Sequence, residues 1–106
     1  MCEHTKKFLS LLGLCRRAGC LSTGFQAITD AMSAGNARAV FAAADISAKT
    51  FKELVFGAGK IHIPVFRLKI DSSELTAAVG FKTGTVSIND EGFANAAKCL
   101  IDTSAI

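Results

Sequence analysis

The sequence predicts a single α/β domain, a three-layer α/β/α sandwich in which helices cover both faces of a small mixed sheet of about four strands. Three observations support this fold class. Segments with the apolar spacing of helices alternate with short apolar runs typical of strands. The run at residues 38–44 is almost entirely apolar, as expected of a strand covered on both faces. The 106 residues contain no linker, repeat or low-complexity stretch, so residues 1–106 are expected to form one domain.

The first third of the chain predicts two helices joined by a short extended segment. Thr5 is expected to cap the first helix and Gly19 to end it. The apolar face of this helix consists of Phe8, Leu11, Leu12 and Cys15. An extended piece at residues 20–23 leads to a second helix at about residues 24–34, closed by Gly35. The second helix is expected to bury Ile28, Ala31 and Met32.

The middle of the chain predicts a strand, a helix and a second strand. Asp45 ends the strand at residues 38–44, and Ser47 caps a third helix that fades at residues 57–59. The inward side chains of that helix are expected to be Phe51, Leu54 and Val55. Residues 63–68 form the next strand, with a proline near its start, where a missing N–H is tolerated.

The last third of the chain predicts two helices separated by a loop and a strand. Residues 71–74 resemble a capping box and open a short helix that runs through Ala78. Residues 80–84 form a loop and residues 85–88 a short strand. The last helix begins near residues 89–91, where acidic side chains suit its positive N-terminus. It is expected to bury Phe93, Ala97, Leu100 and Ile101.

The charge and hydropathy of the chain limit its partners. The formal net charge is +3, with basic residues spread along the chain, so RNA binding is permitted but not required. No apolar run reaches the roughly 20 residues of a membrane-spanning helix. The first residues lack the apolar core and cleavage site of a secretory signal. We therefore expect a cytoplasmic, monomeric protein with no membrane partner.

Four cysteines, Cys2, Cys15, Cys20 and Cys99, raise the question of a disulfide or a metal site. Disulfides rarely persist in a reducing compartment. Cys15 and Cys20 do not have Cys-x-x-Cys spacing, and neither histidine lies at a zinc-like distance from them in the sequence. Cys15 shares the apolar face of the first helix, so we expect it to act as a small core hydrophobe. Zinc or redox chemistry is the less favoured alternative, and no metal or cofactor is predicted.

No catalytic site is predicted, and the chain is not expected to be an enzyme. The sequence has no nucleophile–base pair and no glycine-rich phosphate loop in a strand–turn–helix context. The glycines at 57 and 59 follow a helix instead. Asp45, Asp71 and Asp90 lie at or just before predicted helix starts, where capping explains them.

Six segments carry, in order, a resemblance to a known family. They are residues 8–19 (FLSLLGLCRRAG), Gly24, residues 40–45 (VFAAAD), residues 63–65 (IPV), residues 74–75 (EL) followed by 79–80 (VG), and residues 88–93 (INDEGF). Their order and spacing over nearly the whole chain resemble the kink-turn RNA-binding ribosomal proteins. This is the superfamily of large-subunit proteins seven-A-e and thirty-e, and the resemblance is to its YlxQ-like bacterial branch. The resemblance implies one α/β/α domain of the seven-A-e type, in agreement with the predicted fold.

The resemblance also implies an RNA site at the start of the second helix. In RNA-binding members, a Gly-x-Asn-Glu-x-x-Lys motif there contacts sheared G·A pairs of a bent duplex, and an apolar loop before the last strand covers a flipped-out base. By position the motif falls on residues 24–30 (GFQAITD), where only Gly24 matches. Gln26 replaces the asparagine and Ala27 lacks the carboxylate. Asp30 puts a negative charge where the lysine belongs, and this charge repels phosphate.

The candidate RNA-binding residues surround this motif. They are Arg16, Arg17, Gly24, Phe25, Gln26, Arg38, Val79, Gly80, Phe81 and Lys82. Phe81 either stacks on an extruded base or packs back onto the core. The arginine pair either contacts phosphate or satisfies the carbonyls at the end of the first helix. Gly24 suits a turn in either case.

Two functions fit these observations. The first is a non-catalytic, ribosome-associated protein that binds structured RNA, such as ribosomal or kink-turn RNA, with the ribosome or the translation or transcription machinery as its setting. The alternative is a protein-interaction module on the same scaffold, because Gln26, Ala27 and Asp30 depart from the family motif.

Overall fold

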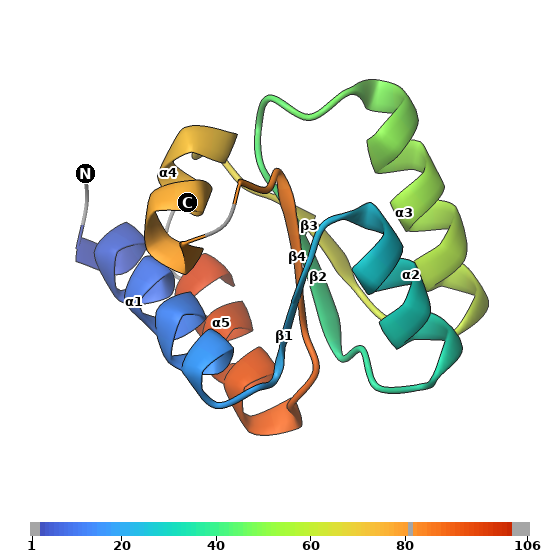
Figure 1. Cartoon of the computed structure of the whole chain (residues 1–106), viewed down its shortest axis with the longest axis horizontal. Helices are drawn as coiled ribbons and strands as arrows, with labels where there is room; N and C mark the ends of the chain where they lie inside the picture. The colour runs from blue at the N-terminus through green and yellow to red at the C-terminus, as the bar shows by residue number, and fades with distance from the viewer. Residues whose placement is uncertain (1–2, 81, 103–106) are drawn as a thin grey trace.

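A computed structural model describes the chain over residues 3–80 and 82–102. This part of the chain forms five helices that alternate with four strands (Figure 1). In chain order they are α1 (Glu3–Arg17), β1 (Leu21–Thr23), α2 (Phe25–Ser33), β2 (Ala39–Ala42), α3 (Ala48–Lys60), β3 (Val65–Arg67), α4 (Ser72–Val79), β4 (Thr85–Ile88) and α5 (Glu91–Asp102). The predicted elements are therefore all present, and most of the predicted bounds hold to within a few residues.

The four strands form one mixed sheet in the order β1-β4-β2-β3. Strand β4 runs antiparallel to both of its neighbours, whereas β2 and β3 are parallel. Strands β1, β2 and β3 consequently point the same way, and their carboxyl ends lie at one edge of the sheet. The mixed sheet of four strands confirms the predicted fold class.

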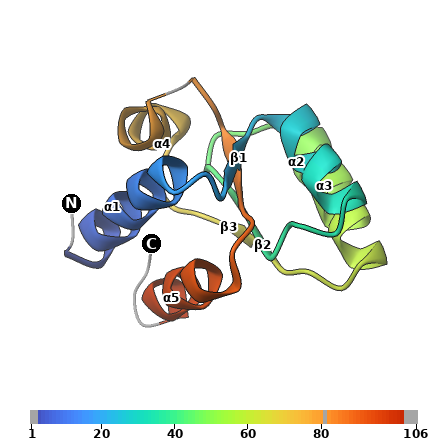
Figure 2. The ribbon, with the colours of Figure 1, turned by 60° about the horizontal axis from the view of Figure 1, so that its bottom comes forward.

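Helices cover both faces of the sheet (Figure 2). Helices α2 and α3 pack on one face, and α1, α4 and α5 pack on the other. Strand β2 contributes to both hydrophobic clusters: Val40 packs with Ile28 and Leu54 on one face, and Phe41 packs on the other. The Phe41 ring lies 5.2 Å from that of Phe8 and 5.3 Å from that of Phe66, measured between centroids. Every residue of β2 is buried, as its continuous apolar sequence predicted.

Glycines end the first two helices as predicted. Gly19 has a φ of 78°, its N–H donates to the Arg16 carbonyl, and the Cys20 N–H donates to the Cys15 carbonyl. Gly35 repeats the arrangement at the end of α2, with a φ of 77°. These paired hydrogen bonds form a Schellman motif, which satisfies carbonyls at a helix end and requires a left-handed residue.

Three predictions about helix ends and faces were wrong. Thr5 lies inside α1 and is buried, so it does not cap that helix. Val55 is 44% exposed, and Leu54 and Ala58 form the buried face of α3 instead. Helix α3 also continues through both of its glycines to Lys60, because tertiary packing outweighs the weak helix propensity of glycine.

Candidate nucleic-acid interface

Three helices begin at the same edge of the sheet. Helices α2, α3 and α4 follow the carboxyl ends of β1, β2 and β3, and the loop at residues 80–84 enters β4 from this side. Helix N-termini carry partial positive charge and orient backbone N–H groups outward. This edge is therefore the part of the fold best suited to receive an anion.

Side chains of the protein itself cap two of these three N-termini. Ser47 accepts a hydrogen bond from the Thr50 N–H at the start of α3, at 3.1 Å. Asp71 accepts from the Glu74 N–H at the start of α4, at 2.9 Å. Asp45 also serves α4, because its carboxylate accepts from both the N–H and the hydroxyl of Ser72, and these bonds lower its pKa. Both helix ends thus have an intramolecular acceptor.

The N-terminus of α2 has no side-chain cap. Its N-cap residue is Gly24, which has a φ of 88° and no side chain to accept a hydrogen bond. No acidic residue lies in the first turn of α2. An external anion would therefore meet no negative side chain of that first turn.

A hydrogen-bond network joins this helix end to the loop at residues 80–84. The Gly24 N–H donates to the Thr83 hydroxyl at 3.2 Å and to the Thr85 carbonyl at 3.3 Å. The Thr83 hydroxyl donates in turn to the Thr85 carbonyl at 2.6 Å. The Thr83 N–H donates to the hydroxyl of Thr76 on α4 at 3.1 Å. The network holds Thr83 and Thr85 against the start of α2, so the described end of the loop and the start of the helix lie side by side.

Sequence reasoning did not single out Thr83. It is a buried threonine, 6% exposed, whose partner Gly24 lies 59 residues away in the chain. No local sequence pattern predicts a contact over this separation. The only signal was the position of Thr83 in a glycine-flanked loop just before a strand.

The guanidinium of Arg16 lies against the start of the same loop. Gly80 ends α4 with a φ of 84°, and its N–H donates to the Thr76 carbonyl. A Cβ at Gly80 would lie 2.8 Å from Nη1 of Arg16, so the missing side chain leaves room for the guanidinium. Arg16 and Arg17 also line a polar depression of about 310 Å³ between α1 and α4. The carbonyls of Cys15 and Arg16, at the end of α1, accept backbone N–H groups.

Three side chains of interest are exposed on α2: the predicted RNA-binding residues Phe25 and Gln26, and Asp30 at the last position of the family motif. Phe25 is 38% exposed at the first position of the helix. The side-chain amide of Gln26, also exposed, donates to the carboxylate of Asp30 at 3.0 Å. A negative charge therefore lies in the second turn of α2, beyond its uncapped end.

The structure brings together only part of the predicted site. Gly24, Phe25 and Gln26 lie next to the loop that contains Gly80 and the exposed Lys82, with Arg16 and Arg17 at the start of that loop. Val79 is 1% exposed and belongs to the core, so it supports the loop from beneath.

The remaining two predicted residues are Phe81 and Arg38. Phe81 lies outside the described residues. Arg38 precedes β2 at the opposite end of the sheet, where its N–H donates to the Ile88 carbonyl, roughly 10 Å along the strand from the site.

The described residues contain no group of three or more His, Cys, Asp or Glu side chains that could hold a metal ion. Cys15 is fully buried in the core, as predicted. Burial, and then the neighbouring Cys20, raise the pKa of the Cys15 thiol to about 12. No helix in the described part of the chain is long and apolar enough to cross a membrane.

The fold and this edge define an α/β/α domain with one helix N-terminus open to an anion, and comparisons with known proteins place it in a family. No family model matches the chain. The chain is 33% identical over 99 residues to the RNA-binding protein YlxQ of Enterococcus faecium, and the match covers 93% of this chain and 95% of that protein. The chain therefore belongs to the YlxQ family, as its motifs predicted.

Solved structures agree with this assignment. A protein of unknown function from Bacillus halodurans superposes with a TM-score of 0.84 at 33% identity, covering 91% of this chain and 97% of that one. The 15.5kD RNA binding protein of Giardia lamblia superposes with a TM-score of 0.75 at 18% identity, covering 97% and 88%. The second likeness concerns the fold alone.

Proposed function

We propose that this protein is a non-catalytic RNA-binding protein that contacts structured RNA through the N-terminus of α2 and the loop at residues 80–84. The observation that carries the proposal is the uncapped end of α2, which Thr83 joins to the loop. Membership of the YlxQ family supports it, because the relative from Enterococcus faecium is an RNA-binding protein.

The chemistry of the edge suits a bent or irregular RNA better than a regular duplex. Bases are hard to read in the deep major groove of A-form RNA, whereas kinks and bulges expose base edges and unstacked bases. The open N–H groups of α2 would donate hydrogen bonds to a phosphate or a base carbonyl, and Phe25 offers an exposed ring beside them. Arg16, Arg17 and Lys82 would neutralise the phosphates on either side of the loop.

The resemblance to kink-turn binders motivates the more specific part of the proposal. A kink-turn, as found in ribosomal RNA, is the RNA class that we propose, with the ribosome or the translation or transcription machinery in the cytoplasm as its setting. Gln26 retains an amide at the motif position, and the arginine pair offsets the charge lost there. Asp30 opposes phosphate, so binding is expected to be weaker than with the full motif.

A binding titration tests this function. The full chain is titrated with a kink-turn RNA and with an unkinked duplex of equal length, at two salt concentrations. We expect selective binding of the kink-turn that weakens with salt. The double substitution Arg16→Glu/Arg17→Glu should weaken binding by about a hundredfold. Lys52→Glu/Lys60→Glu, which makes the same charge change on α3, should have little effect.

Two outcomes count against the function. Equal affinity for kink-turn and duplex would indicate general polyanion binding rather than recognition of RNA structure. Failure of the folded wild-type chain to bind either RNA would reject RNA binding and favour the protein-interaction alternative.

A further inference from the structure

Helix α3 and its C-cap residue expose three large apolar side chains. Phe56 is 68% exposed, and Val55 and Ile61 are 44% and 41% exposed. Val55 and Phe56 are adjacent in α3, and Ile61 is its C-cap residue. Exposed apolar side chains that lie close together mark interaction sites more often than scattered single ones do. An aromatic ring as exposed as Phe56 is a suitable anchor for a partner.

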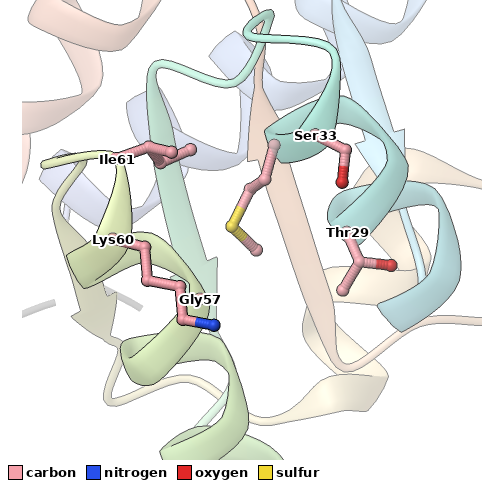
Figure 3. Close-up of a pocket in the computed structure, with 6 residues that line it drawn as sticks. Thr29, Ser33, Gly57, Lys60 and Ile61 are labelled. Carbon is pink, nitrogen blue, oxygen red and sulfur yellow. The ribbon is translucent and has the colours of Figure 1, made fainter.

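A groove between α2 and α3 adjoins this part of α3. It has a volume of about 260 Å³, enough to hold a large apolar side chain, and it is lined by Thr29, Met32, Ser33, Gly57, Lys60 and Ile61. Figure 3 shows Thr29 and Ser33 of α2 facing Gly57, Lys60 and Ile61 across it. A Cβ at Gly57 would lie 3.7 Å from the Met32 sulfur, so the missing side chain opens the space above the thioether. Methionine adapts readily to varied apolar ligands.

Basic side chains surround the exposed ring and the groove. Lys49, Lys52 and Lys60 are exposed on α3, where Glu53 is the only acidic residue. Their spacing from Phe56 places them on the same side of the helix. The ammonium group of Lys60 lies 4.4 Å from the centre of the Phe56 ring. An apolar anchor site is thus bordered by positive charge.

We propose that this α3 face, defined as Lys49, Lys52, Phe56, Lys60 and the adjoining groove, binds an acidic, amphipathic segment of a partner protein. One apolar side chain of the segment would enter the groove beside Met32, and another would pack on Phe56. Carboxylates on either side would pair with the three lysines. The proposal does not depend on RNA binding.

The charges argue against two other occupants. A second copy of the chain that docked through the same face would place these lysines against each other, which is unfavourable in a two-fold interface. A nucleic-acid base would have to displace Lys60 from the Phe56 ring in order to stack on that side. Val55, adjacent to Phe56 in the helix, and Ile61, which lines the groove, are aliphatic and suit a protein partner.

The α3 face is separate from the proposed RNA site. Phe56 lies nine residues beyond Ser47, which is about 13 Å along the helix from the edge where α2, α3 and α4 begin. Arg16 and Gly80 belong to the layer on the other side of the sheet. Substitutions on α3 and at the end of α1 can therefore serve as controls for each other.

A displayed library of random peptides tests the proposal. The library is selected for binding to the full wild-type chain and depleted against Phe56→Ala. We expect enriched peptides to be acidic and to carry apolar residues at helical spacing. A synthetic peptide with an enriched sequence should bind about tenfold more weakly to Lys52→Glu/Lys60→Glu than to the wild-type chain. Gly57→Leu, which fills the groove, should weaken its binding by a similar factor. Its affinity for Arg16→Glu/Arg17→Glu, which makes the same charge change elsewhere, should fall much less. Circular dichroism checks that each variant is folded.

Several results would overturn the proposal. The absence of peptides that depend on Phe56, or the enrichment of neutral or basic ones, would reject an acidic partner. Concentration-dependent dimers that disappear in Phe56→Ala would assign the face to self-association. Loss of kink-turn RNA binding in Phe56→Ala would assign it to RNA. A Phe56→Ala variant that still binds the RNA but no longer binds the peptide would support the proposal. Loss of RNA binding in Arg16→Glu/Arg17→Glu, with peptide binding retained, would support it too, because it would show that the two sites are separate.

Discussion

The side-chain amide of Gln26 donates a 3.0 Å hydrogen bond to the carboxylate of Asp30, one turn further along α2. Both side chains are exposed on the helix whose uncapped N-terminus forms the proposed RNA site. The bond holds the Gln26 amide beside a negative charge. This pair therefore limits how closely a phosphate or a base acceptor can approach the α2 surface.

Replacing Asp30 by lysine should strengthen RNA binding. The substitution removes a negative charge, adds a positive one and releases the Gln26 amide. A cation near the C-terminus of a helix is also favourable for stability. We expect the affinity for a kink-turn RNA to rise about tenfold and the salt dependence to steepen by about one phosphate contact. Titration at several salt concentrations measures both.

Asp30→Asn separates charge from hydrogen bonding in that comparison. The asparagine can still accept from Gln26 but has no charge. An affinity between those of wild type and Asp30→Lys would fit the electrostatic explanation. No change in either variant would mean that Asp30 does not face the RNA. Binding that is absent in wild type and gained in Asp30→Lys would mean that the scaffold is intact and its RNA site has been lost.

Removing the Thr83 hydroxyl should destabilise the protein and loosen the loop. The hydroxyl bridges the Gly24 N–H and the Thr85 backbone while buried. Thr83→Val keeps the shape but leaves buried polar groups without this partner, at a cost of about 2 kcal/mol. Chemical unfolding measures the free-energy change. Thr83→Ser keeps the hydroxyl, so its free energy of unfolding should fall by well under half as much as that of Thr83→Val. Equal decreases in the two variants would indicate an effect of packing instead.

Gly80 and Gly19 provide a matched test of the Arg16 position. Both have positive φ, so alanine at either site should cost about 1 kcal/mol of stability. A Cβ at Gly80 meets the Arg16 guanidinium, whereas one at Gly19 meets nothing within 4 Å. Gly80→Ala should therefore move Arg16 and weaken RNA binding more than Gly19→Ala does. Equal RNA affinities in the two variants would place Arg16 outside the site.

The bonds from Ser72 to Asp45 should make the stability of the fold depend on acid pH. They lower the pKa of the Asp45 carboxyl below its ordinary value of 3.8. A carboxyl with a lowered pKa in the folded state stabilises the protein above its unfolded pKa, and that stability is lost as the pH falls through the folded pKa. Asp45→Asn and Ser72→Ala should each flatten the acid limb of a stability–pH profile. An unchanged profile in both variants would contradict this coupling.

The buried Cys15 thiol should make the fold sensitive to alkaline pH. Its pKa rises from the ordinary 9.0 to about 12 because burial opposes ionisation. The folded protein then keeps this thiol neutral while the unfolded chain ionises it, so stability is full below pH 9.0 and falls as the pH rises towards 12. Unfolding midpoints measured across this range should decline less in Cys15→Ala than in wild type. Cys99→Ala, on the exposed face of α5, should keep the wild-type slope.

Local sequence patterns predicted most of the fold because residues with strong conformational preferences mark where its helices begin and end. Gly19 and Gly35 end helices through left-handed geometry, and Ser47 and Asp71 begin them through side-chain caps. The apolar run of β2 needs no tertiary information to be read as a buried strand.

Predictions that depend on tertiary contacts were less accurate. Val55 was predicted to face the core, yet it is 44% exposed, because α3 turns Leu54 and Ala58 towards the sheet instead. Arg38 was predicted to bind RNA together with Arg16, but it lies at the other end of the sheet. It precedes the first residue of β2, whereas the site lies at the carboxyl end of that strand. The role of Thr83 depends on a contact across 59 residues, which no local pattern contains.

The central claim is that RNA binds at the uncapped end of α2, and backbone amide resonances of the isotope-labelled chain test it most directly. A kink-turn RNA is added until the spectrum no longer changes. The claim predicts saturable shifts at Gly24, Phe25, Gln26 and Thr83, with Phe56 and Lys60 on α3 unaffected. Saturable shifts confined to α3, or RNA binding that leaves the α2 amides unchanged, would contradict it.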